Sequence, residues 1–217
     1  MSMSLTLHMH PLASFCQKAL IALYENGTPF EPHLVDLAHD VASAQFKALW
    51  PMGKMPVLRD EARDRTIAES TIIIEYLDQH YPGANRLIPA DPEQALQARF
   101  GDRFYDLYVH EPMQKIVIDR LRSEGRNDPF GVEQARATMH TAYGMIELAM
   151  ASRIWAAGNA FTMADCAAAP ALFYANKVVP FSETHPRVAA YFGRLMERPS
   201  FARVVREAEP YLKLFPQ

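Results

Sequence analysis

The chain has 217 residues and a formal net charge of −3, with 49% hydrophobic and 22% charged residues. These values are typical of a soluble globular protein that forms one large domain or two small ones. Charges of one sign do not gather in blocks, so nucleic acids and anionic membranes are excluded as partners. No apolar run approaches the roughly 20 residues that span a bilayer, and the first residues lack the pattern of an export signal.

The two cysteines, Cys16 and Cys166, lie far apart in the sequence. They give neither a disulfide framework nor a metal-binding spacing, which favours a reducing, cytoplasmic compartment. His8 and His10 can lie on one face of a strand, but no third ligand follows at a recognisable spacing. We therefore expect no metal site.

The N-terminal part alternates short strands and helices. Residues 5–9 alternate apolar and polar side chains, which predicts a strand, and a helix should run from about Ser14 to a glycine cap at Gly27. Further strands are expected at residues 30–37, 57–60 and 66–68, and a helix at residues 70–80. The order strand–helix–strand–helix–strand–strand–helix predicts a small α/β layer with a mixed sheet, and it is also the order of a thioredoxin-like domain.

Residues 82–91 contain helix-breaking residues and form the expected linker. They divide the chain into a domain at 1–82 and an all-helical domain at 91–217, where no strand is predicted. Helices are expected from Asp91-Pro92, over residues 132–152, and from Pro186 and Pro199.

Two features within the helical part predict local geometry. Pro112 should kink or interrupt the helix that begins near Pro92, because proline lacks the N–H group of a helix interior. Thr162 and Asp165 have nearly the spacing and residue types of a capping box, in which the third position prefers Glu or Gln.

The most informative motif is residues 53–58 (GKMPVL), followed eleven residues later by Glu69 and Ser70. Pro56 precedes a short apolar strand, and a cis bond there would aim the backbone groups of Met55 at a ligand. Glu69 and Ser70 place a hydroxyl and free N–H groups at a helix N-terminus, which suits a carboxylate. Together they suit a short, charged peptide in an extended conformation.

These motifs, with residues 21–27 (IALYENG), 157–165 (AGNAFTMAD) and 198–201 (RPSF), resemble those of the glutathione S-transferase family in their order and spacing. The resemblance spans almost the whole chain. It implies an α/β thioredoxin-like N-terminal domain followed by an all-α C-terminal domain, glutathione as cosubstrate, and a two-fold homodimer.

Carried over to this chain, the resemblance assigns a glutathione site. Glu69 pairs with the ammonium of the γ-glutamyl unit, while Ser70 and the helix N-terminus meet its carboxylate. The backbone of Met55, ahead of Pro56, pairs with the cysteinyl unit, and Lys54 reaches the glycyl carboxylate. In the alternative interpretation Ser70 only caps a helix, and Glu69 and Lys54 are solvated charges.

Glutathione reacts as a thiolate, so the family uses a Tyr, Ser or Cys near the first helix to activate the thiol. No tyrosine precedes Tyr24, and the family position falls most often on Ala13 in this chain. The neighbouring Ser14 is therefore the expected catalytic residue, with capping of the helix as the alternative role. We expect Cys16 to be a structural residue, although a helix N-terminus can make a thiol reactive.

The resemblance further implies a pocket for an electrophilic substrate, for which the candidates are Tyr105, Tyr108, His110 and Met113. Ordinary packing is the alternative for these residues. The expected function is conjugation of the glutathione thiolate to small electrophilic hydrophobic substrates. The alternatives are a glutathione-dependent disulfide reductase, which uses Cys16 or the sulfur of the ligand, and a non-catalytic family member used for protein interaction.

Overall fold

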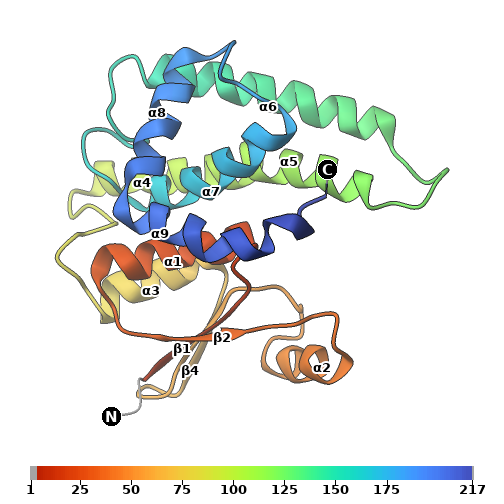
Figure 1. The fold of residues 1–217 in the computed structure, drawn as a ribbon. Helices are drawn as coiled ribbons and strands as arrows, with labels where there is room; N and C mark the ends of the chain where they lie inside the picture. Colours follow the sequence, from red (N-terminus) through yellow and green to blue (C-terminus); the bar gives the residue numbers. More distant parts are fainter. Residues whose placement is uncertain (1–3, 217) are drawn as a thin grey trace.

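The computed structural model describes residues 4–216 (Figure 1). The first three residues, which belong to the segment in which no export signal is expected, lie outside this range. The α/β region contains a four-stranded sheet of order β2-β1-β3-β4, in which β2 runs parallel to β1 and the hairpin β3–β4 is antiparallel. The strands are β1 (Leu5–Met9), β2 (Glu31–Leu34), β3 (Val57–Asp60) and β4 (Arg65–Ala68).

The predicted alternation of β1 is confirmed. Leu5, Leu7 and Met9 are buried, while the side chains between them are partly exposed. Their apolar face packs against α1 (Ser14–Asn26) and α3 (Ser70–His80), which lie on one side of the sheet (Figure 1). The helix α1 ends at Gly27 with φ 61°, the left-handed cap that glycine adopts most easily.

Two N-terminal elements differ from the sequence prediction. The strand expected at residues 30–37 covers only Glu31–Leu34, an edge strand whose four residues are all exposed. Pro32 within it is tolerated because an edge strand leaves one row of N–H groups unpaired. The helix α2 (Asp40–Leu49), whose place in the element order was predicted without bounds, buries Phe46 against Val35.

The helical region begins after residues 81–91, which carry no helix or strand. Beyond this point the described residues form no strand apart from one isolated bridge, Trp155–Gly158. The elements are α4 (Pro92–Phe104), η1 (Tyr105–His110), α5 (Glu111–Arg120), α6 (Pro129–Ala149), α7 (Met163–Val178), α8 (Pro186–Glu197), α9 (Pro199–Ala208) and η2 (Glu209–Leu214).

The central helix of this region is α7, which is buried along nearly its whole length. The predicted capping box at its start is confirmed: the Thr162 hydroxyl accepts from the Ala164 N–H, and the Asp165 carboxylate accepts from the Thr162 N–H at 2.9 Å. The next helix upstream, α6, begins at Pro129 rather than near residue 132, because Asp128 caps it by accepting from the Gly131 N–H.

The helix that begins near Pro92 is interrupted ahead of Pro112, and the interruption is a widened helical turn. The segment η1 is a π-helix between α4 and α5, and the Glu111 N–H donates to the Asp106 carbonyl five residues earlier. Pro112 cannot donate to a carbonyl four residues back, and a widened turn relieves this conflict. The turn leaves both Asp106 and His110 buried.

A buried lysine joins the two regions. The side chain of Lys18 on α1 is 1% exposed, and its Nζ lies 2.7 Å from Asp102 of α4 and 2.8 Å from Asp106 of η1. It also donates to the hydroxyl of Thr71 on α3, which in turn donates to Asp102. The ammonium is therefore in contact with groups from three different elements: it donates to Asp106 and Thr71 and forms an ion pair with Asp102.

We predict that Lys18→Met lowers the free energy of unfolding by about 3–5 kcal/mol, because it leaves two carboxylates buried without their cation. Arg99→Met is the matched control: Arg99 forms an exposed ion pair with Glu75 across the same two regions, and its loss should cost about 1 kcal/mol or less. Urea denaturation measures both losses. Equal losses would contradict a structural role for the buried network.

Candidate functional site

A cleft between the α/β region and the helical region contains two adjoining hollows. One is polar, with a volume of about 390 Å³, and the other is larger and more apolar, at about 640 Å³. Phe15, Lys54 and Met55 line both. The cleft is therefore one continuous site with a charged end and an apolar end.

The N-terminus of α3 opens into the polar hollow. Ser70, Thr71 and Ile72 line it, and their N–H groups belong to the first helical turn, which has no partners within the helix. Glu69 alone connects β4 to α3, and it does so at φ 68°, a left-handed value that is rare for glutamate. Such strain is typical of functional sites, and here it joins the end of a strand directly to a helix N-terminus, a position that favours anions.

All five residues expected to bind glutathione line this hollow: Lys54, Met55, Pro56, Glu69 and Ser70. The bond between Met55 and Pro56 is cis. Lys54 and Glu69 are exposed and Ser70 is buried, so two opposite charges surround a buried hydroxyl.

Three charged residues of the helical region complete the polar hollow, and the sequence analysis did not find them: Arg103, Asp106 and Glu111. The Arg103 guanidinium lies 3.5 Å from the Asp106 carboxylate, which is itself bound to Lys18. The sequence holds one sign of these residues, because Asp102 and Asp106 lie one turn apart in a helix that is otherwise partly apolar. The two carboxylates can be interpreted as partners of a buried cation only together with Lys18, which is distant in the sequence.

Ser14 lies in the apolar hollow at the N-terminus of α1. It is not the helix cap, because Ala13 holds that position and no side chain caps this helix. Instead the Ser14 Oγ lies 3.1 Å from Nδ1 and 3.2 Å from Nε2 of His110. The hydroxyl therefore faces the cleft and a histidine of the opposite region.

His110 is almost fully buried beside Ser14. The Phe15 ring packs edge-on against its imidazole at 4.3 Å between centroids. Burial, assisted by the positive charge of Lys18, lowers the pKa of His110 to about 4. The imidazole is thus neutral at physiological pH and carries a single N–H group.

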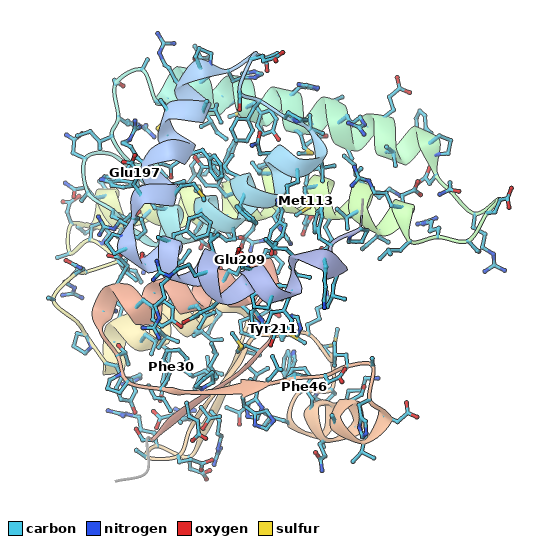
Figure 2. The ribbon with its side chains drawn as sticks, in the orientation of Figure 1. Phe30, Phe46, Met113, Glu197, Glu209 and Tyr211 are labelled. Atoms are coloured by element: carbon cyan, nitrogen blue, oxygen red, sulfur yellow. The ribbon has the colours of Figure 1, made fainter. Side chains whose placement is uncertain are left out.

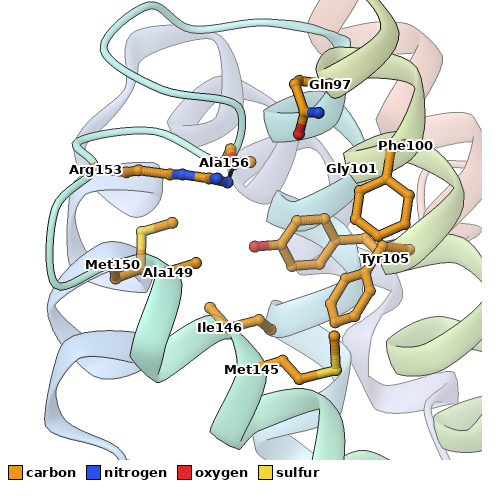
Figure 3. Close-up of a pocket in the computed structure, with 11 residues that line it drawn as sticks. Gln97, Phe100, Gly101, Tyr105, Met145, Ile146, Ala149, Met150, Arg153 and Ala156 are labelled. Atoms are coloured by element: carbon orange, nitrogen blue, oxygen red, sulfur yellow. Dashed lines mark hydrogen bonds between the residues drawn. The ribbon is translucent and has the colours of Figure 1, made fainter.

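The other predicted residues divide between two places. His110 and Met113 line the apolar hollow, and Met113 lies on α5 (Figure 2). Tyr105 instead lines a separate cavity of about 210 Å³ between α4 and α6 (Figure 3). Tyr108 is 49% exposed and packs against Phe104, outside the residues that line the cleft. The structure brings Ser14, His110 and Met113 together but not the two tyrosines.

The C-terminal end also lines the apolar hollow, which the sequence analysis did not anticipate. Phe215 stacks on Tyr174 at 5.3 Å between centroids, and the Tyr174 hydroxyl donates to the Leu12 carbonyl just before α1. Pro216 is also part of this wall, and its carbonyl accepts from Arg120. Nothing in the local pattern of residues 209–216 marks this contact.

The cysteines are buried and unpaired. Burial raises the pKa of Cys16 to about 12, so the group is a thiol rather than a nucleophilic thiolate at neutral pH. Burial, followed by the charge of Asp165, also raises the pKa of Cys166 well above its ordinary value. Within residues 4–216 no group of three or more His, Cys, Asp or Glu side chains is placed to hold a metal ion. In the same range, no helix has the length and apolar character needed to cross a membrane.

Comparisons with known proteins agree with this geometry. Residues 7–85 match the family model for the glutathione S-transferase N-terminal domain, and residues 109–199 match the model for its C-terminal domain. The chain is 25% identical to a glutathione S-transferase of Pseudomonas putida, over 97% of this chain and 96% of that protein. It is 28% identical to FtsZ-localized protein A of Caulobacter vibrioides, over 98% of this chain and 95% of that protein.

Among solved structures, the chain is similar to a glutathione S-transferase of Methylobacterium radiotolerans in complex with glutathione sulfonate. The TM-score is 0.79 at 27% identity, with 93% of this chain and 94% of that chain covered. The two family models, the relatives of full length and the shared fold give one conclusion. The chain belongs to the glutathione S-transferase family.

Proposed function

We propose that this protein conjugates the thiolate of glutathione to small electrophilic hydrophobic substrates, a chemistry that serves detoxification. One observation carries the proposal: the Ser14 hydroxyl, the N-terminus of α3 and the Met55-Pro56 turn all face one cleft. The hydroxyl lies at the apolar end and the charged groups at the other. A thiol held between them would face an apolar substrate.

Glutathione would lie extended along the cleft. Its γ-glutamyl carboxylate would accept from Ser70 and the first-turn N–H groups of α3, and its ammonium would pair with Glu69, with Asp106 nearby. The backbone of Met55 would pair with the cysteinyl unit, and Lys54 would reach the glycyl carboxylate. The charges of the polar hollow match those of the ligand.

In the reaction the Ser14 hydroxyl would donate a hydrogen bond to the sulfur, and the N-terminus of α1 would stabilise its negative charge. Both effects favour loss of the thiol proton to solvent. The sulfur would then attack an electrophilic carbon in the apolar hollow, forming a C–S bond, while a leaving group departs with the bonding electrons. Ser14 keeps its own proton throughout.

We predict that Ser70→Ala weakens glutathione binding by about 1.5–3 kcal/mol, because one charge-assisted hydrogen bond is lost. This corresponds to an affinity about ten- to a hundredfold lower. Isothermal titration calorimetry measures it, with Ser182→Ala, at an exposed serine between α7 and α8, as the control. Absence of binding by the wild type, or equal affinity of wild type and Ser70→Ala, would refute the assigned site.

We predict that Ser14→Ala lowers the conjugation rate by about a hundredfold or less, since a donor to sulfur is softer than a donor to an oxyanion. Cys16→Ser should retain activity, because its thiol is buried and protonated. The assay uses a panel of electrophiles and mixed disulfides. Full activity of Ser14→Ala with loss in Cys16→Ser would instead favour the disulfide reductase. If both variants match the wild type, backbone N–H groups alone activate the thiol.

A non-catalytic role in protein interaction is the second alternative. One relative of nearly full length, FtsZ-localized protein A, has a name that refers to localization rather than to a reaction. Retention of Glu69, Ser70 and the Met55-Pro56 turn at one hollow favours a ligand-binding role instead. The conjugation assay separates the two, because a protein with an interaction role alone would show no turnover with any electrophile in the panel.

We also propose a two-fold homodimer in a reducing cytoplasm. The two unpaired cysteines suit a reducing compartment. Large apolar side chains are exposed on α3, α4 and α6, and such surfaces are typical of contacts between subunits: Ile72, Leu96, Phe100 and Met145.

We predict that light scattering at micromolar concentration gives twice the chain mass of 24.5 kDa. Ile72→Lys should shift the mass towards one chain, because it would bury a charge in the contact. The exposed Ile118→Lys on α5, outside the three helices that carry these side chains, should leave the mass unchanged. A wild type that is monomeric at this concentration would refute the dimer.

A further inference from the structure

We infer that Tyr174 is a positioning residue for Ser14: its hydroxyl holds the turn between β1 and α1, and the geometry of this turn sets where the Ser14 hydroxyl lies. The inference rests on the proposed function, in which Ser14 activates the thiol of glutathione. It gives Tyr174, on α7 of the helical region, a role in that activation beyond its place in the wall of the apolar hollow.

Residues 11–13 form the turn that connects β1 to α1, and each of its backbone polar groups has a partner. Both of its N–H groups donate to His10, one to the ring nitrogen and one to the carbonyl. The last of its three carbonyls accepts from the backbone N–H of Gln17, within α1. The other two carbonyls, of Pro11 and Leu12, accept from side chains. The conformation of the turn therefore depends on these side chains as well as on its own neighbours.

The directions of the side-chain bonds follow from the chemistry of the groups. The Gln17 Nε2 lies 2.8 Å from the Pro11 carbonyl and 2.9 Å from the Tyr174 hydroxyl. Because a carbonyl only accepts, the amide nitrogen faces Pro11, and its second N–H donates to Tyr174. The Tyr174 hydroxyl lies 2.7 Å from the Leu12 carbonyl, which also only accepts. Tyr174 therefore accepts from Gln17 and donates to Leu12.

Tyr174 is a firm anchor for the turn. Its side chain is 2% exposed on a helix that is buried along nearly its whole length. Its ring stacks on Phe215 with 23° between the ring planes. Burial raises the pKa of the Tyr174 hydroxyl, so the group keeps its proton and remains a donor over the pH range in which thiols titrate. The turn of the α/β region is thus held from the helical region.

The turn leads directly into Ser14, the first residue of α1. No side chain caps this helix, so its N-terminus takes its position from the turn that precedes it. The Leu12 carbonyl, to which Tyr174 donates, is only two residues before Ser14. A hydroxyl donates well to a sulfur only within a narrow range of distance and angle, so a small shift of the turn would weaken the activation.

The experiment measures the pKa of the bound glutathione thiol from the ultraviolet absorbance of the thiolate as a function of pH. In the wild type this pKa should lie below the ordinary value of about 8.5, and Ser14→Ala should raise it by about one to two units. Tyr174→Phe, which removes the hydroxyl and keeps the stacked ring, should raise it by about half a unit, because Ser14 remains but is less well placed.

Calorimetry with S-methylglutathione on the same samples measures ligand binding without a thiol. Tyr174→Phe should leave this affinity within about twofold of the wild type, because the charged groups of the polar hollow are unchanged. A general loss of stability is tested by Tyr143→Phe. The Tyr143 hydroxyl is also buried and donates to a carbonyl, that of Val179 at 3.0 Å, but far from the turn. Tyr143→Phe should leave the thiol pKa unchanged.

The double variant shows whether Tyr174 acts through Ser14. In the Ser14→Ala background, the rise caused by Tyr174→Phe should fall to less than half of its size in the wild type, since the group that it positions is absent. Gln17→Met, which removes the amide bound to both Pro11 and Tyr174, tests the same turn if Tyr174→Phe does not fold. It should raise the thiol pKa by a similar amount.

The outcomes separate the inference from the proposed function. If the wild type does not bind glutathione, or if Ser14→Ala leaves the thiol pKa unchanged, the proposed role of Ser14 is refuted and the inference with it. If both hold but Tyr174→Phe leaves the pKa unchanged, or raises it equally in the Ser14→Ala background, only the role of Tyr174 is overturned. A rise that shrinks in that background, with unchanged binding of S-methylglutathione, supports it.

Discussion

The ion network around Lys18 is the constraint on which the cleft depends. A single buried ammonium binds Asp102, Asp106 and Thr71, and through them it fixes α4 and η1 against α1 and α3. The polar hollow is lined by residues of all four elements, and the apolar hollow by residues of α1 and η1 among them. Since Lys18 lies one turn after Ser14, α1 carries both the buried ammonium and the Ser14 hydroxyl. One side chain thus links the contact between the two regions to the helix that carries the proposed activating group.

This network has an electrostatic consequence for the site. Two carboxylates face one ammonium, and burial raises the pKa of Asp106 against the opposing effect of Lys18. Arg103, on the solvent side, supplies a second cation 3.5 Å from Asp106. Asp106 therefore connects the interior network with the polar hollow, where it lies on the same surface as Glu69. The ammonium of a bound ligand would meet the Asp106 carboxylate, which Lys18 holds in position from the protein interior.

The features that depend only on neighbouring residues could be predicted from the sequence. The alternation of residues 5–9, the cap at Gly27 and the box at Thr162 each depend on neighbours within a few positions, and each is found in the structure. Local patterns also marked Met55, Pro56, Glu69 and Ser70 as a ligand site, whereas Ser14, Lys54 and the substrate-pocket residues could be named only through the family resemblance. The contacts that give them an environment join residues far apart: Ser14 and His110 are 96 positions apart, and Lys18 and Asp106 are 88 apart. A lysine is ordinarily solvated, so no local pattern marks Lys18 as the centre of a buried network.

The same network explains why hydrogen bonds, rather than an ion pair, face the proposed position of the sulfur. Lys18 is close to Ser14 in the helix, but its charge is directed to Asp102 and Asp106. A sulfur anion at Ser14 would meet a hydroxyl and the partial positive charge of a helix N-terminus. A full cation would lower the thiol pKa more, but the nucleophilicity of a thiolate falls as its pKa falls, and the best attacking thiol has a pKa near the ambient pH. A moderate donor such as Ser14 suits this requirement. Because the lysine is bound to carboxylates, its charge does not face the proposed position of the sulfur.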